Sequence, residues 1–146
     1  MTVEERLTMP YWVIDILPEQ VPADRGAHWL RLERACLAEP HRTRIRRRFA
    51  GVLLRLNAYV SFRVMTPEED MVWDDPAPDR LAALLTETDL DLLILPEGED
   101  SLITVNRDDL YMTLYHPSDA MLRRVGALAA AEGLFLRRPP REGGDP

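Results

Sequence analysis

Two kinds of apolar periodicity alternate along this chain, and together they restrict its fold class more than any other feature. Segment 58–65 alternates between two faces, with apolar residues on one of them, which is typical of a half-buried strand. Segment His41–Leu56 carries apolar residues at i, i+4, i+7 and i+11, which is one face of a helix. Strands and helices in mixed order predict an α+β fold, with a single mixed or antiparallel sheet and helices mainly on one face.

The turn and cap signals divide the chain into further elements. Gly133 and Asn57 are expected to end helices in the left-handed conformation, and Ser118 is a good helix N-cap. Thr66–Pro78 is expected to be an acidic loop, and the C-terminal half reads hairpin–helix–strand. The expected elements are a strand in Pro10–Pro18, helices at Ala27–Ala38 and His41–Leu56, a strand at 58–65, a helix at Asp79–Thr86, a strand at Leu90–Leu95, a hairpin of Ser101–Val105 and Leu110–Tyr115, a helix from Ser118 to Glu132 and a strand at Leu134–Arg137.

Length and composition favour one compact domain. The chain has 146 residues, 46% of them hydrophobic, so it can bury a core without a metal or disulfide. We expect a single domain over 1–138 and a loose tail over 139–146. Its start has no secretory signal pattern, and no apolar run is long enough to span a bilayer. Cys36 is the only cysteine and is expected in the core, which fits a cytoplasmic protein.

Charge is segregated along the sequence. Residues 25–63 hold ten Arg and two acidic residues, whereas residues 66–109 hold fourteen acidic residues and two Arg, although the net charge is −7. Every basic residue is Arg, whose planar guanidinium suits bidentate contacts with carboxylates and phosphates. Three interpretations stay open: the two segments face each other and cancel, one of them docks a partner, or copies associate pole to pole.

The helix predicted at His41–Leu56 carries the strongest candidate site. Arg44, Arg47, Arg48 and Arg55 fall within one arc of about 100°, opposite its apolar stripe. Such a stripe can be solvated or internally paired, or it can bind an acidic protein or a phosphate polymer. It lacks interleaved aromatic residues, and the chain is acidic overall, which disfavours nucleic acid. Whether the acidic segment 66–109 covers the stripe decides between these alternatives.

Asp15 and Tyr11 define a second candidate site. Asp15 lies in the middle of an apolar strand, where a buried carboxylate is either ion-paired or functional. We expect either a structural ion pair, with an Arg from one of the first two helices as a natural partner, or an Asp exposed at a sheet edge. The alternative is a pocket around Tyr11 and Asp15 that faces Arg63 or His116.

Motifs for other chemistry are missing from the sequence. Its seven glycines form no phosphate-binding loop, and the three histidines and Cys36 have no zinc-site spacing. We therefore expect no cofactor, no metal and no catalytic residues. Tyr111–Tyr115 is an aromatic strand that packs in the core or, if it lies at a sheet edge, adds a strand from a partner or a second copy.

Three segments resemble a group of short uncharacterised bacterial proteins. They are YWVIDILPEQVP from Tyr11, YMTLY from Tyr111 and AEGLF from Ala131. The resemblance covers most of Pro10–Arg137 and implies a stand-alone bacterial protein. It implies no activity and no site residue.

Segregated charge without catalytic signatures predicts a small cytosolic interaction or accessory protein rather than an enzyme. We expect charge-guided docking of a protein partner, with no membrane partner. The alternatives are a nucleic-acid or polyanion binder that uses the arginine-rich helix, and a small enzyme or ligand-binding domain around Asp15. Self-association through the charge poles or the Leu110–Tyr115 strand also remains open.

Overall fold

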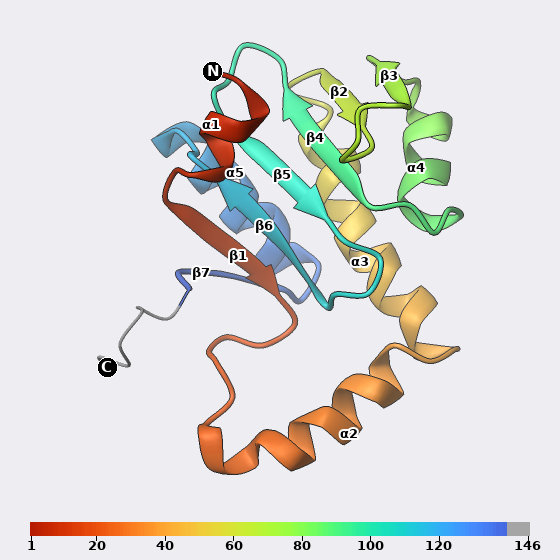
Figure 1. Ribbon diagram of the computed structural model, residues 1–146, viewed down its shortest axis with the longest axis vertical. Coiled ribbons are helices and arrows are strands. Elements are labelled where there is room, and N and C mark those ends of the chain that lie inside the picture. The colour runs from red at the N-terminus through yellow and green to blue at the C-terminus, as the bar shows by residue number, and fades with distance from the viewer. Residues whose placement is uncertain (140–146) are drawn as a thin grey trace.

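The computed structural model describes residues 1–139, and those residues form one antiparallel sheet with its helices mainly on one side (Figure 1). The strand order is β3-β2-β4-β5-β6-β1-β7, and every pairing is antiparallel. This confirms the predicted α+β class. The strands are β1 (Tyr11–Asp15), β2 (Phe62–Met65), β3 (Val72–Asp74), β4 (Leu92–Pro96), β5 (Leu102–Val105), β6 (Tyr111–Tyr115) and β7 (Phe135–Arg137).

Three helices cover one face of this sheet, and a short helix touches the other. In Figure 1, α3 and α5 lie behind the sheet, α1 lies in front of it near the top, and α2 extends below it. α3 packs against both α4 and α5, so the three form one layer. The helices are α1 (Val3–Leu7), α2 (Gly26–Cys36), α3 (His41–Leu56), α4 (Pro78–Thr86) and α5 (Asp119–Ala131), and a 3₁₀ turn at Ala23–Arg25 precedes α2.

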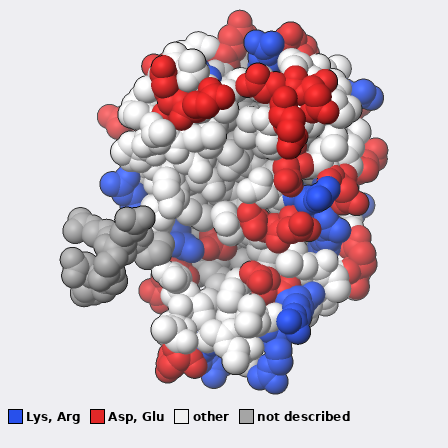
Figure 2. Space-filling model, in the orientation of Figure 1, with Lys and Arg blue, Asp and Glu red and all other residues white. Residues whose placement is uncertain are grey.

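The face of the sheet turned away from this helix layer is largely uncovered. Only α1 packs on it: Val3 contacts a small buried cluster of Met65, Leu93 and Leu102. Figure 2 looks onto this open face and shows an uncoloured central depression, with Asp and Glu side chains above it and both acidic and Arg side chains at its right. The open face therefore presents apolar and neutral groups inside a border that is acidic at the top and mixed at the right.

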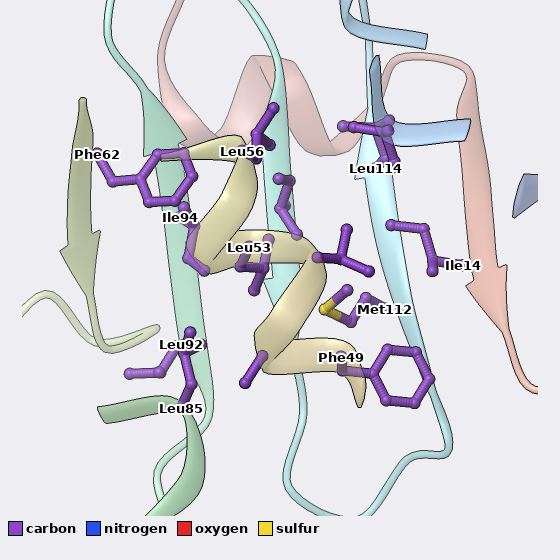
Figure 3. Packing of buried hydrophobic residues seen from close by; sticks show 14 of the residues in the cluster. Ile14, Phe49, Leu53, Leu56, Phe62, Leu85, Leu92, Ile94, Met112 and Leu114 are labelled. Carbon is purple, nitrogen blue, oxygen red and sulfur yellow. The ribbon is translucent and has the colours of Figure 1, made fainter. Parts of the chain in front are cut away.

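The main core lies between the helix layer and the sheet (Figure 3). Phe49, Leu53 and Leu56 of α3 point at the sheet, where Ile94 and Met112 meet them. Fully burying one such side chain stabilises the fold by about 1.5–3 kcal/mol, so the apolar stripe of α3 accounts for its docking. The opposite side of α3, which carries the arginines, must then face solvent.

Local signals set several element ends as expected. The Ser118 hydroxyl accepts a hydrogen bond from the Met121 backbone N–H and caps α5. Gly133 follows that helix at φ +72°, a conformation that side chains with a Cβ rarely adopt. Asn57, in contrast, is right-handed at φ −63°, so its predicted left-handed stop is wrong. Its side-chain amide instead donates to the Val60 carbonyl and holds a turn, which delays β2 until Phe62.

Two elements were missed by the sequence analysis. β3 lies inside the predicted acidic loop, because Val72 and Trp73 pair with Met65 and Val64 of β2. α1 begins at a capping box in which Thr2 and Glu5 bond each other's backbone N–H. β3 has only three residues and α1 only five, too few for a periodic pattern to show.

The Leu110–Tyr115 segment is not a sheet edge. β6 pairs with β5 on one side and β1 on the other, so its backbone groups are already bonded. Strand addition by a partner or a second copy at this segment is therefore excluded. The predicted tail falls almost wholly on 140–146, outside the described residues.

Candidate functional site

The arginine face, which we define as Arg44, Arg47, Arg48 and Arg55, is exposed along the outer side of α3. With a rise of about 1.5 Å per residue, these guanidinium groups extend over about 16 Å of the helix axis. Arg44, Arg47 and Arg48 form no ion pair with any residue in 1–139. Arg55 lies 3.4 Å from the Glu132 carboxylate, with 56% of its side chain exposed.

The acidic segment is held by other arginines of the same helix. Arg42 and Arg46 approach Asp89 at 3.2 and 3.8 Å. Both guanidinium groups also donate to backbone carbonyls of the acidic segment, Arg42 to Arg107 and Arg46 to Leu85 and Thr88. Burial, followed by the charge of Arg42, lowers the pKa of Arg46. The acidic segment thus packs against the flank of α3 and leaves the arginine face uncovered.

An aromatic residue lies near the C-terminal end of α3. Tyr59 follows the helix and is 63% exposed, and the Arg124 guanidinium of α5 sits 4.6 Å from its ring centroid. Sequence analysis found no aromatic group within the stripe itself. The Tyr59–Arg124 contact depends on how α5 packs beside α3, so spacing along α3 alone could not reveal it.

Asp15 forms the structural ion pair that was expected, but with a different partner. Its Oδ2 lies 2.6 Å from Nη2 of Arg137 in β7, and both side chains are mostly buried. Its Oδ1 accepts from the backbone N–H groups of Ile16 and Leu17. Both carboxylate oxygens are therefore occupied. The natural partners named from the sequence lay in the first two helices, and the arginine actually used is 122 residues away along the chain.

Tyr11 belongs to a group of three tyrosines on the open face. Directly opposed residues of antiparallel strands share a face, and Tyr11 opposes Tyr115 across β1 and β6, with ring centroids 5.3 Å apart. Tyr111 opposes Asp15 four positions further along each strand, and the Val13–Thr113 pair lies between. Three cross-strand pairs thus form a patch with tyrosines at both ends.

This patch lines a hollow of ≈ 480 Å³, which we call the tyrosine hollow. Tyr11, Tyr111 and Tyr115 form its walls, and Val13 and Thr113 form a floor that is less than a tenth exposed. A second hollow of ≈ 260 Å³ continues past Asp15 toward Trp29 of α2, and the two share Gln20, Tyr111 and Arg137. Tyr11 and Asp15 therefore lie in adjoining hollows.

The residues expected to face that pocket lie elsewhere. Arg63 is on β2 and pairs with Asp74 at 3.2 Å. His116 follows β6 at φ +49°, and its backbone N–H bonds the Pro10 carbonyl. Neither lines the two hollows. Arg137 and Tyr111 take their place, and only the strand order brings them to Asp15.

Tyr111 and Tyr115 keep their hydroxyl protons unusually firmly. Burial raises the pKa of both groups above 10.0. For Tyr111 the next cause is the negative charge of Asp109, and for Tyr115 it is the neighbouring Tyr11. The hollow therefore presents neutral hydroxyl groups and ring faces at physiological pH.

The described part of the chain offers little support for a metal site, a core cysteine or a membrane-spanning helix. No group of three His, Cys, Asp or Glu residues within 1–139 could hold a metal ion. Cys36 is half-buried at the end of α2, a helix that buries no residue, so its predicted place in the core is wrong. None of the described helices has the length and apolar character needed to cross a bilayer.

Comparison with known proteins adds nothing to this geometry. No family model, no curated protein and no solved structure matches the chain. The resemblance to a group of bacterial proteins stays a prediction from the sequence.

Proposed function

We propose that this protein is a small interaction protein that docks an acidic partner protein through the arginine face of α3. The observation that carries this proposal is that the arginines of one helix fall into two groups with different contacts. Arg42 and Arg46 hold the acidic segment, whereas Arg44, Arg47 and Arg48 remain exposed without an ion pair in 1–139. The fold thus does not use these three charges for internal neutralisation.

The arrangement fits carboxylates on a folded surface. Guanidinium groups bind carboxylates in a planar, bidentate manner, and a rigid helix fixes their spacing. Burial of Phe49 and Leu53 beneath the arginine face anchors that helix. The net charge of −7 repels a nucleic acid at long range, because a nucleic acid is negative along its whole length. A protein with a single acidic patch is repelled less.

Affinity capture with a charge-reversed variant tests the proposal. Bait protein in which Arg44, Arg47, Arg48 and Arg55 are all changed to Glu is compared with wild type in a nuclease-treated bacterial lysate at low salt. We expect wild type to retain a partner protein and the variant to lose it, because reversal turns attraction into repulsion. Circular dichroism should show unchanged folding, since all four side chains are exposed.

A matched control separates the face from the overall charge. Changing Arg25, Arg31, Arg34 and Arg80 to Glu alters the net charge equally at exposed positions elsewhere. This control should retain the partner. Loss of the partner from both variants, or retention by both, would contradict docking through the arginine face.

One observation favours a nucleic-acid or polyanion partner as the second candidate. Tyr59, beyond the C-terminal end of α3, presents an exposed ring that can stack on a base. This candidate predicts that the logarithm of the affinity for mixed DNA and RNA falls linearly with the logarithm of the salt concentration. A flat salt response, or no binding at low salt, removes it.

An enzyme built around Asp15 has less support. A general base needs a free oxygen within reach of substrate, and both oxygens of Asp15 already accept hydrogen bonds. The adjoining hollows are better suited to holding a ligand than to transforming one.

A further inference from the structure

The tyrosine hollow is not used by the docking proposed above, because it lies on the opposite side of the sheet from α3. Its volume of ≈ 480 Å³ is within the range of about 300–1,000 Å³ that small-molecule sites occupy. Its walls are tyrosine side chains carried by two paired strands, β1 and β6. Tyr11 and Tyr111 nevertheless remain 39% and 42% exposed, so a ligand can reach their ring faces.

The charges around this hollow are negative in balance. Arg137 lines it, but the Asp15 carboxylate at 2.6 Å offsets that charge. Glu19 and Glu33 line the adjoining hollow, and Asp109 acts on Tyr111 strongly enough to raise its pKa. Within the described residues, these three carboxylates have no ion pair.

We propose that the tyrosine hollow binds a small organic cation, an ammonium or quaternary ammonium group attached to an apolar body. The electron-rich faces of Tyr11, Tyr111 and Tyr115 attract such a cation, and the nearby carboxylates add a favourable field. The Val13 and Thr113 side chains form a floor for the apolar body. Gln20 at the margin offers a polar contact that fixes orientation.

The charge around the hollow favours a cation over the two other partners that an aromatic surface could bind, a nucleic acid and a second copy of this chain. An aromatic sheet surface can also stack nucleic-acid bases, but such surfaces are bordered by cations that hold the phosphates. Here the carboxylates of Glu19, Glu33 and Asp109 supply negative charge beside the hollow, which opposes a phosphate-bearing ligand. A second copy of this chain would bring the same carboxylates against its own, which disfavours a symmetric dimer on this face.

The proposal is tested by titrating the full chain with benzyltrimethylammonium and monitoring binding by NMR. We expect a dissociation constant of about 1 mM, which suits a ligand of this size, with shifts at Tyr11, Tyr111 and Tyr115. The double variant Tyr11→Leu with Tyr115→Leu should weaken binding about tenfold, since it removes two ring faces. Tyr11→Phe keeps a ring and should bind within about threefold of wild type.

Matched controls make the result decisive. Tyr59→Leu removes an exposed tyrosine outside the hollow and should leave the affinity unchanged. Benzenesulfonate, of similar size but opposite charge, should not bind. Absence of cation binding at about 10 mM, equal binding of benzenesulfonate, or equal loss in Tyr59→Leu would overturn the proposal. A concentration-dependent dimer that contacts these tyrosines would overturn it as well.

Discussion

At the scale of single residues, the Asp15–Arg137 pair decides how the end of the sheet is assembled. Asp15 is 8% exposed, and its carboxylate joins β1 to the final strand β7. A buried carboxylate with a partner and two backbone donors is stable, whereas either member left alone is costly. The pair is therefore a structural feature that also shapes the tyrosine hollow, because Arg137 forms part of its wall.

Removal of one member of this pair should destabilise the protein. We expect Asp15→Ala to lower the free energy of unfolding by about 3 kcal/mol, because it leaves the Arg137 guanidinium buried and unpaired. Urea unfolding measures this loss. The double variant Asp15→Leu with Arg137→Leu should recover most of the stability, to within about 1 kcal/mol of wild type. A loss as large in the double variant as in the single one would show that packing, not charge, matters at this position.

The tyrosines give the stability a defined dependence on alkaline pH. Burial raises the pKa of Tyr111 and Tyr115 above 10.0 in the folded protein, so folding favours their neutral forms. This contribution is fully present below the unfolded pKa and is lost as the pH rises through the folded pKa. Urea midpoints should therefore fall as the pH rises past the ordinary tyrosine pKa of about 10.

The phenylalanine variants check this assignment. Tyr111→Phe with Tyr115→Phe keeps both rings and removes both titrating hydroxyls, so its urea midpoint should fall less steeply over the same pH interval. An identical slope in wild type and variant would show that other groups cause the alkaline loss.

At the scale of elements, α2 differs from α3, α4 and α5 in how little of it is buried. It buries none of its residues, and Leu30 and Leu32 are 53% and 45% exposed. α3, which follows it, buries five residues from Phe49 to Leu56. Helices in proteins are stabilised mostly by packing of an apolar face, so α2 has little tertiary support.

Amide hydrogen exchange should therefore separate α2 from α3. We expect α2 to exchange through local opening, with protection far below that of α3, which opens only with the core. Gly26→Ala should slow exchange in α2 alone, because Ala favours the helix by up to about 1 kcal/mol and no other part of the fold lies within 4 Å of the added Cβ. Equal protection of α2 and α3 would mean that something covers α2 in solution.

At the scale of the whole molecule, charge is divided between two surfaces. The arginine face lies outside the helix layer, and acidic side chains border the opposite, open face of the sheet (Figure 2). The two proposed binding sites thus face in opposite directions with opposite charge. The two proposals together predict that an acidic partner and a cationic ligand bind at the same time.

The predicted single domain has a direct thermodynamic consequence. α3, α4 and α5 contribute to one cluster with strands β1, β2, β4, β5 and β6, so no subset can lose its core alone. We expect one cooperative unfolding transition, with coincident changes in far-UV and near-UV circular dichroism. Two separated transitions would contradict a single domain over 1–138.

The sequence by itself determined most of the elements. His41–Leu56 was predicted with the bounds that α3 has, and the β5–β6 hairpin and the Ser118 cap were predicted as well. Apolar periodicity and caps are local, so a chain displays them before any long-range contact forms. Elements as short as α1 and β3 lie below the length at which periodicity can be recognised.

Only the tertiary structure decided which side chains meet. Period-two alternation showed that Asp15 shares a strand face with Tyr11, but not that β7 would lie beside β1 and supply Arg137. The sequence showed six arginines in α3 but not which of them would hold Asp89. Strand order and helix packing follow from the burial of a common core, to which every element contributes. The hollow, the ion pair and the exposed arginine face follow from that packing, because each combines residues whose separation along the chain carries no signal.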